Sequence, residues 1–198
     1  MSKFNETTLA ILAGGNALRM QGANKALLKY NGITFINRIV NELSELFAQT
    51  IIISNTNDIR DLTPFNVYKD IIAGKGPLGG IHAALHHSLT PWVFIVSCDM
   101  PLVNAITAKK IISHINVNSS YRALVPLHRE KIEPLFAIYS TKTINALADV
   151  LSGNNLSIKR FLDCIKTKYV ELPDLADVDE CFTNINTLED LNSLYKRG

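Results

Sequence analysis

Short, uninterrupted apolar runs mark the first half of the chain. They occupy residues 9–13, 51–53 and 92–96. Runs of this length without polar alternation are typical of strands that are buried on both faces of a parallel sheet. Between the runs, apolar residues recur at intervals of three and four, which predicts helices with one apolar face. These helical patterns cover residues 35–46, 81–85 and 106–115.

The second half mixes the same patterns in a different order. Strands are predicted at residues 124–126, 134–139 and 169–172, and helices at 142–151, 157–165 and 187–195. Thr187 is expected to cap the last helix, with Asp190 completing a capping box. Strands that alternate with helices connect through right-handed crossovers. We therefore predict an α/β fold: a doubly wound, mostly parallel, Rossmann-like sheet with helices on both faces.

Composition narrows the class of protein. Of the 198 residues, 47% are hydrophobic and 19% charged, which allows a sizeable core and argues against disorder. The 20 Lys and Arg against 18 Asp and Glu lack the basic excess of a nucleic-acid binder. Three cysteines without a C-x-x-C pair predict neither a disulfide framework nor a zinc site. With no repeat or linker, one domain over residues 1–198 is predicted.

The polar N-terminus and the short apolar runs bear on location. Residues 1–6 lack the basic start and apolar stretch of a signal peptide, and no run is long enough to span a bilayer. We therefore expect a cytoplasmic protein that has no membrane partner and no nucleic-acid partner.

The first predicted strand ends in a glycine-rich loop, Leu12-Ala13-Gly14-Gly15. Paired glycines let backbone N–H groups approach a phosphate closely, and Arg19 and Lys25 add positive charge to the same loop. The loop has neither the Walker spacing nor the G-x-G-x-x-G pattern. Spacing alone therefore leaves two interpretations open: a phosphate-binding loop or an ordinary strand-to-helix turn.

Two further strand ends carry candidate site residues. Gly76-Pro77-Leu78, with Gly80 ahead of a predicted helix, is either a close approach of backbone to a ligand or a surface turn. Asp99 directly follows a buried strand and suits Mg²⁺, which binds one or two carboxylates plus phosphate oxygens. The alternative, a cap for a helix starting near Asn104, is less favoured because Asp99 comes several residues too early. Since ligands bind at the carboxyl ends of parallel strands, we expect these groups to share one site.

A fourth element lies near the C-terminus, where residues 182–187 read Phe-Thr-Asn-Ile-Asn-Thr. Asn184 and Asn186 occupy alternating positions of an extended segment and should point to the same side. They either bind a substrate or, for Asn186 in particular, cap the final helix.

The glycine-rich loop, followed by Arg19-Met20 and Lys25, resembles the opening signature of the MobA family of molybdenum cofactor guanylyltransferases. This family belongs to the Rossmann-like nucleotidyltransferases of the glycosyltransferase A type. The Gly76 loop, Asp99 and the asparagine segment resemble later motifs of the family in the same order, over residues 8–191. Relatives that make cytidine-linked products or activate sugars tend to carry alanine at the position of Gly14.

The chain departs from the family pattern at three places. Gln21 stands where glycine is usual, and Asn24 stands where Asp commonly precedes the lysine. The family often has an arginine shortly after the glycine that corresponds to Gly153, and here only Lys159 or Arg160 could take its place. The contacts to the pterin phosphate are therefore undefined by the sequence.

The resemblance implies a reaction and a set of residues. GMP would pass from GTP to the terminal phosphate of molybdenum-molybdopterin, with release of pyrophosphate, and Mg²⁺ would be the cofactor, held by Asp99. The catalytic residues implied are Arg19, Lys25 and Asp99, and the pterin contacts are Asn184 and Asn186. The implied GTP-binding set is Leu12, Ala13, Gly14, Gly15, Lys25, Asn55, Asp70, Gly76, Gly80 and Asp99.

Further partners and alternatives follow from the same comparison. Proteins that deliver the cofactor and molybdoenzymes that accept it are the implied protein partners. A related cytidylyltransferase or sugar-phosphate nucleotidyltransferase is the alternative enzyme, and a nucleotide-binding module without activity is the alternative outside the enzymes. Such a module would have little need for Arg19, Lys25 and Asp99 together at strand ends.

Overall fold

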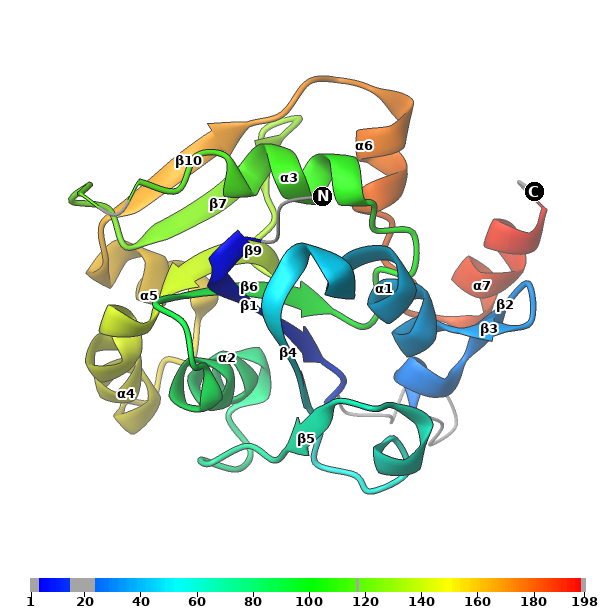
Figure 1. The fold of residues 1–198 in the computed structure, drawn as a ribbon, viewed down its shortest axis with the longest axis horizontal. Coiled ribbons are helices and arrows are strands. Elements are labelled where there is room, and N and C mark those ends of the chain that lie inside the picture. The colour runs from blue at the N-terminus through cyan, green and yellow to red at the C-terminus, as the bar shows by residue number, and fades with distance from the viewer. Residues whose placement is uncertain (1–3, 15–23, 117, 197–198) are drawn as a thin grey trace.

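The structure is a computed structural model that describes residues 4–14, 24–116 and 118–196. An eight-stranded sheet forms its centre, in the order β10-β7-β9-β6-β1-β4-β5, with β8 paired to β7 (Figure 1). The strands are β1 (Phe4–Leu12), β4 (Phe47–Ile53), β5 (Asn66–Tyr68), β6 (Trp92–Ser97), β7 (Ala123–His128), β8 (Lys131–Ile132), β9 (Phe136–Ser140) and β10 (Thr167–Glu171). A separate hairpin pairs β2 (Lys29–Tyr30) with β3 (Ile33–Thr34).

Strand direction divides the sheet into two halves. β1 runs parallel to β4 and β6, and β4 runs parallel to β5. β9 runs antiparallel to both β6 and β7, while β10 runs parallel to β7. The predicted, mostly parallel sheet is confirmed, and β9 is the strand that reverses its direction within it.

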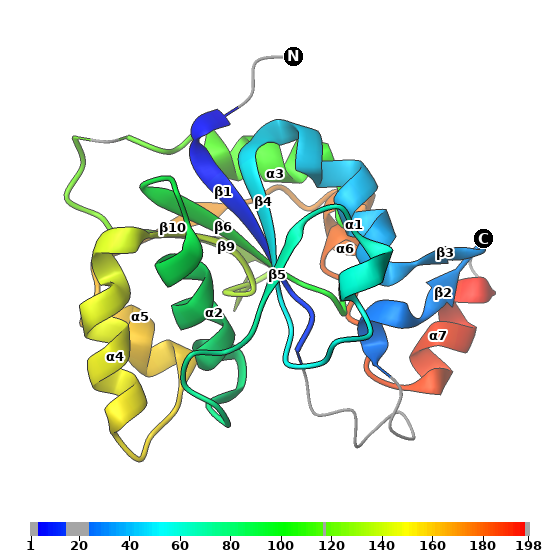
Figure 2. The same cartoon turned by 60° about the horizontal axis from the view of Figure 1, so that its bottom comes forward.

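Helices cover both faces of the sheet, as the doubly wound prediction requires (Figure 2). Alternate residues of β1 show why: Leu9 and Ile11 pack on one face, and Ala10 and Leu12 on the other. The helices α1 (Phe35–Leu43), α3 (Ala105–Ile112) and α6 (Ala176–Cys181) bury their apolar residues on the first face. The helices α2 (Gly76–His87), α4 (Ile144–Ser152) and α5 (Ile158–Cys164) do so on the second.

The last helix, α7 (Leu188–Tyr195), packs beside the β2–β3 hairpin. A small cluster of Tyr30, Phe35, Ile185 and Leu194 fills the space between them. Thr187 caps α7, and the Asp190 side chain accepts from the Thr187 N–H, so the predicted capping box is present. This packing fixes the segment that carries both candidate asparagines.

The structure differs from the sequence-based boundaries most clearly at α2. The helix was expected to begin after the Gly76 loop, but it begins at Gly76 itself, with proline in its first turn. The fixed φ of Pro77 suits the first turn of a helix, where its missing N–H would have no partner within the helix. Short elements were missed altogether: β5, β8, α6 and the β2–β3 hairpin. No helix within the described ranges is both long and apolar enough to cross a membrane.

Candidate functional site

The carboxyl ends of β1, β4 and β6 meet at one edge of the sheet. Leu12 aligns with Ile53 on one side and with Ser97 on the other. The pairing continues past the strand ends, because Ala13 N–H donates to Ile53 O (2.8 Å) and Cys98 N–H donates to Leu12 O (3.0 Å). Leu12, Ala13 and Gly14 therefore lie between the segments that follow β4 and β6. Gly15 and Arg19, both predicted site residues, lie outside the described residues.

Asn55 and Asp70 form a reciprocal pair at the β4–β5 side of this edge. Asn55 Nδ2 donates to Asp70 Oδ2 (2.9 Å), and Asp70 N–H donates to Asn55 Oδ1 (3.0 Å). A Cβ on Gly14 would lie 3.8 Å from Asn55 Nδ2, and one on Gly79 would lie 3.4 Å from Asp70 Oδ2. The structure thus brings Gly14, Asn55, Asp70 and the first turn of α2 together at one edge of the sheet.

The glycines of α2 differ in what they do. Gly76 has a positive φ of 57°, a backbone conformation that favours glycine where the helix begins. Gly80 is buried, and a Cβ there would lie 3.2 Å from Leu12 Cδ2. Gly80 therefore allows α2 to pack closely against β1, while Leu12, itself buried, presents only backbone to the edge.

Lys25, Asp99 and Asn186 converge at the centre of the edge. Lys25 Nζ donates to Asn186 Oδ1 (2.8 Å) and lies 4.0 Å from Asp99 Oδ2. Both charged side chains are 22% exposed, so their charges remain open to a ligand. Residues 161 positions apart in the chain are joined here, and this convergence is the strongest geometric feature of the site.

The contacts of Asn24 show why asparagine can replace the aspartate that is common at this position in the family. Its Oδ1 accepts from Ala26 N–H (3.1 Å) and caps the short 3-10 helix Lys25–Leu27. Its Nδ2 donates to Thr56 Oγ1 (3.1 Å) and to both carboxylate oxygens of Asp58 (3.1 and 3.2 Å). An aspartate at position 24 could not donate to Asp58 and would repel it, so asparagine is the residue that ties the Lys25 turn to the loop after β4.

Asp99 is held through its backbone, and its Oδ2 lies near Lys25. Its carbonyl oxygen accepts from Ile185 N–H (2.8 Å). Its Oδ1 is buried without a hydrogen-bond partner among the described residues, which is costly unless a cation or donor fills the place. The alternative role as a helix cap is excluded, because Asn104 caps α3 by accepting from Thr107 N–H (2.8 Å).

The neighbouring Cys98 is not a nucleophile of this site. Burial is the main cause that raises the pKa of its thiol to about 12, and the charge of Asp99 adds to the shift. The thiolate, which is the reactive form, is therefore scarce at neutral pH.

Asn184 and Asn186 have separate surroundings. Asn186 does not cap α7, since Thr187 does, and its side chain accepts from Lys25 instead. Asn184 is exposed and donates to Phe182 O (3.3 Å). Hydrogen bonds from the backbone N–H groups of Asn186 and Thr187 lower the pKa of the Asp190 carboxyl, and these bonds hold the turn in which Asn186 meets Lys25.

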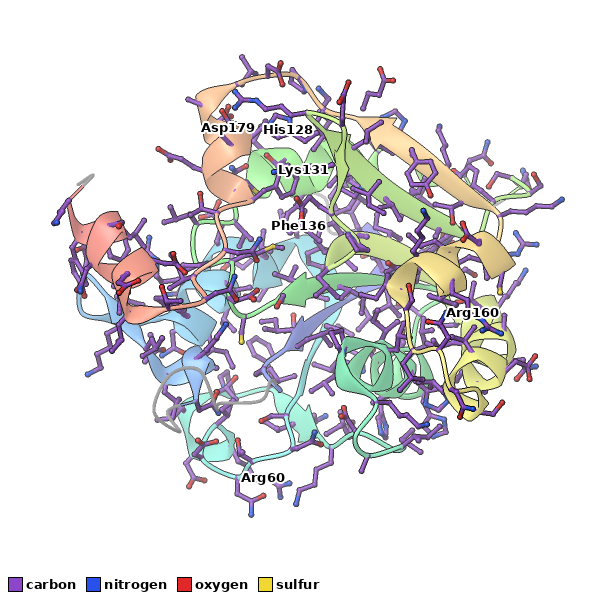
Figure 3. The ribbon with its side chains drawn as sticks, turned by 180° about the vertical axis from the view of Figure 1, so that it is seen from behind. Arg60, His128, Lys131, Phe136, Arg160 and Asp179 are labelled. Atoms are coloured by element: carbon purple, nitrogen blue, oxygen red, sulfur yellow. The ribbon has the colours of Figure 1, made fainter. Side chains whose placement is uncertain are left out.

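Lys159 and Arg160, the suggested substitutes for the missing family arginine, are exposed on α5. Figure 3 shows Arg160 on the side of the molecule opposite α6 and α7. The structure therefore does not bring Arg160 to the segment that carries Asn184 and Asn186.

Among the described residues, the centre of the edge offers the Lys25 ammonium and the Asp99 carboxylate, and the β4–β5 end offers the Asn55–Asp70 pair. No group of three or more His, Cys, Asp or Glu side chains among the described residues could hold a metal by itself. A divalent cation would therefore need ligand oxygens from a bound anion, which is how Mg²⁺ binds with phosphates. Two contacts of the site were not predicted from the sequence: the bonds from Asn24 to Asp58 and the bond from Ile185 N–H to Asp99 O. Both join segments that are far apart in the chain.

Comparison with known proteins gives a consistent result. The model of the MobA-like NTP transferase domain family matches residues 9–169. A probable molybdenum cofactor guanylyltransferase of Clostridium perfringens is 35% identical over 194 residues, which is 95% of this chain and 96% of that protein. A molybdenum cofactor guanylyltransferase of Syntrophotalea carbinolica is 34% identical over 191 residues, covering 95% and 90%.

Among solved structures, the molybdopterin-guanine dinucleotide biosynthesis protein A of Archaeoglobus fulgidus superimposes with a TM-score of 0.78 at 24% identity, covering 96% of this chain and 100% of that one. A cytidylyltransferase of Leptospira borgpetersenii superimposes with a TM-score of 0.69 at 13% identity, covering 98% and 85%. The fold is thus shared by proteins named for different bases, so the fold alone does not decide which base is used.

Proposed function

The chain belongs to the MobA-like NTP transferase family, and on this premise we propose that it transfers GMP from GTP to the terminal phosphate of molybdenum-molybdopterin and releases pyrophosphate. The relatives named as molybdenum cofactor guanylyltransferases, which match nearly the whole chain, support the guanylyl branch. The observation that carries the proposal for the site is the convergence of Lys25, Asp99 and Asn186 at the carboxyl edge.

The proposed reaction needs no nucleophile from the protein. An oxygen of the acceptor phosphate forms a bond to the α-phosphorus of GTP, the bond between that phosphorus and the β-phosphate oxygen breaks, and pyrophosphate leaves. The difficulty is to bring two anions together and to stabilise the charge on the leaving group. Catalysis is therefore positioning plus electrostatic stabilisation.

Lys25 is proposed to offset phosphate charge, since its ammonium lies at the centre of the edge and Asn186 orients it. The backbone at Ala13 and Gly14 would bring N–H groups to the phosphates, with Gly15 and Arg19 in the same loop. Asn55, Asp70 and the first turn of α2 would hold the nucleoside at the β4–β5 end. The acceptor would then occupy the other end, near Asn184 and β9.

Mg²⁺ is proposed as the cofactor, with Asp99 as its protein ligand. The buried Asp99 Oδ1, which has no partner among the described residues, fits such a group. When bound, Mg²⁺ would neutralise phosphate charge and so favour departure of pyrophosphate. The direct test of the whole proposal is release of pyrophosphate from GTP in the presence of molybdopterin.

Base choice gives a first prediction. GTP should raise the melting temperature more than CTP, ATP or UTP at equal concentration, because a ligand that binds only the native state stabilises it by about 2.7 kcal/mol at 100 times its Kd. Thermal shift measurements with each triphosphate, with and without Mg²⁺, make the comparison. An equal or larger shift with CTP would assign the chain to the cytidylyl branch and leave the fold unaffected.

Gly79 gives a second prediction. A Cβ at this position would lie 3.1 Å from Ile72 O and 3.4 Å from Asp70 Oδ2, so Gly79→Ala should displace the loop that carries Asp70. We expect GTP affinity to fall about tenfold, equivalent to 1.4 kcal/mol. The melting temperature should change little, because the roughly 1 kcal/mol that alanine gains over glycine in a helix offsets the cost of displacing the loop.

Gly153→Ala is the matched control for Gly79→Ala. A Cβ at Gly153 would meet only Val150 O, at an ordinary 3.5 Å. Isothermal titration of GTP should give the wild-type affinity for Gly153→Ala. Wild-type affinity in both variants would mean that the Asp70 loop does not contribute to nucleotide binding.

A further inference from the structure

Glu133 lies at the same sheet edge as Asp99, although the chain enters this edge from the opposite direction. β9 runs antiparallel to β6, so the start of β9 lies beside the end of β6. The last bond between them runs from Ser97 N–H to Leu135 O (2.9 Å). Asp99 comes two residues after Ser97, and Glu133 comes two residues before Leu135, so both lie just beyond the paired region.

The backbone of Glu133 is fixed on both sides. Its N–H donates to Pro126 O of β7 (3.0 Å), and its carbonyl accepts from Phe136 N–H (3.1 Å). The β7–β8 hairpin, in which Leu127 pairs with Ile132, delivers the chain to this point. The position of Glu133 is therefore set by the sheet and not by a free loop.

The side chain of Glu133 is partly buried beside Asp99. No hydrogen bond or ion pair of its side chain is found within the part of the chain that the structure describes. Burial raises its pKa first of all; the charges of Lys131 and His128 oppose that shift, and the charge of Asp99 adds to it. The Glu133 carboxylate is therefore available to accept hydrogen bonds from a bound ligand, and a ligand that covers it would need to supply donors.

Two of the cations in the β7–β8 hairpin, His128 and Arg129, contact Asp179 of α6. His128 Nε2 lies 2.7 Å from Asp179 Oδ1, and Arg129 Nη2 donates to Asp179 Oδ2 (2.7 Å). Figure 3 shows His128 next to Asp179, with Lys131 of the same hairpin between them and Phe136 in this view. Phe182 packs against the rings of both His128 and Phe136, with centroids 5.8 and 5.6 Å apart, and leads directly into the asparagine segment.

The order of strands places these groups along one line. Asn55 and Asp70 follow β4 and β5, Asp99 follows β6 in the centre, and Glu133 precedes β9 on the far side. If the nucleoside occupies the β4–β5 end, Glu133 faces the acceptor. The phosphate end of an acceptor would be repelled by this carboxylate and attracted by Lys25, so Glu133 must meet another part of the acceptor.

We propose that Glu133 is a specificity-determining residue that accepts hydrogen bonds from the 2-amino-4-oxopyrimidine edge of the pterin in the acceptor; this rests on the proposed function. That edge presents the 2-amino group and the adjacent ring N–H side by side. Two parallel donors match the two oxygens of a carboxylate, and hydrogen bonds to an ionised acceptor are the strong ones. Lys25 at the phosphate end and Glu133 at the pterin end would then orient the acceptor in one direction.

Two simple probes test the pairing without the molybdenum-containing acceptor. Pterin carries the 2-amino group, and lumazine carries an oxo group in its place, which turns a donor toward Glu133 into an acceptor. Binding of each is measured by quenching of its intrinsic fluorescence, in the presence of GTP. The wild type should prefer pterin by about tenfold, and Glu133→Gln should lose that preference, since a neutral amide no longer accepts two charge-assisted bonds.

Glu130→Gln is the control, because it removes the same charge from the exposed turn of the same hairpin. It should keep the wild-type preference for pterin. Glu133→Gln should also keep the wild-type melting temperature, because no hydrogen bond or ion pair of this side chain within the described residues is lost. A wild type that does not bind pterin, or that binds lumazine equally well, overturns the proposal, as does an unchanged preference in Glu133→Gln.

A titration with Mn²⁺ on the same proteins tests whether Glu133 instead binds the metal ion together with Asp99. Glu133→Gln should bind Mn²⁺ as the wild type does. A loss of Mn²⁺ affinity with the pterin preference intact would assign Glu133 to the metal and overturn the proposal. Stabilisation by GTP, measured in parallel, separates the proposed function from the role of Glu133. If GTP does not stabilise the protein, the proposed function is refuted. If GTP stabilises the protein but pterin is not preferred over lumazine, only the role of Glu133 is refuted.

Discussion

Asp99→Asn is expected to reduce transfer by about 100-fold or more while the protein remains folded, a loss of the size seen when one electrostatic group of an active site is removed. Asparagine has nearly the volume of aspartate and would keep the backbone bond from Ile185 N–H to the carbonyl of residue 99. It is a poor ligand for Mg²⁺. The rate should therefore recover in part at high Mg²⁺, and GTP binding in Mg²⁺ should weaken.

The rate measured against Mg²⁺ concentration for both proteins decides the role of Asp99. The wild type should saturate at lower Mg²⁺ than the variant. Asn104→Ala serves as a structural control, because it removes a true helix cap and should lower stability by about 1 kcal/mol without shifting the Mg²⁺ curve. Curves with the same midpoint and the same maximum for wild type and Asp99→Asn would remove Asp99 from the metal site and with it the main support for the mechanism.

Lys25→Ala is expected to weaken both triphosphate binding and turnover. Lys25 would bind the ground-state triphosphate and would interact more strongly with the charge that develops on the leaving pyrophosphate, so KM should rise and kcat should fall. We expect about a tenfold loss or more in each, since a hydrogen bond to a charged group contributes roughly 1.5–3 kcal/mol. Steady-state kinetics with GTP, together with direct titration of GTP, measure the two effects separately.

Lys29→Ala is the matched control, since Lys29 is an exposed lysine close in sequence, and the Tyr195 hydroxyl donates to its backbone carbonyl, which the substitution keeps. It should behave as the wild type. Asn186→Ala should show a smaller defect than Lys25→Ala, because it frees the ammonium without removing it. Wild-type affinity and rate in Lys25→Ala would mean that Lys25 is a solvated residue of the turn.

The local pattern of apolar residues predicts most of the longer helices and strands but not the residues at which they begin and end. The run at residues 92–96 became β6, and the helical pattern at residues 106–115 became α3, which ends earlier, at Ile112. The beginning of α2 was misjudged because three glycines and a proline read as a loop. Inside the fold, the same glycines permit close contact with Leu12 and the Asp70 loop, and this packing outweighs their weak helix propensity.

The pattern of residues along the chain predicts the class of fold and the strand ends at which Lys25, Asp99, Asn55 and Asp70 gather. Periodicity reports which side chains are buried, and parallel strands present their carboxyl ends together. The tertiary structure alone decided which groups meet across these ends. The bond from Lys25 to Asn186 joins residues 161 positions apart, and Glu133 reaches the edge only because β9 runs antiparallel. Neither the direction of a strand nor a contact between distant segments is encoded in local periodicity, because both follow from how the whole chain packs.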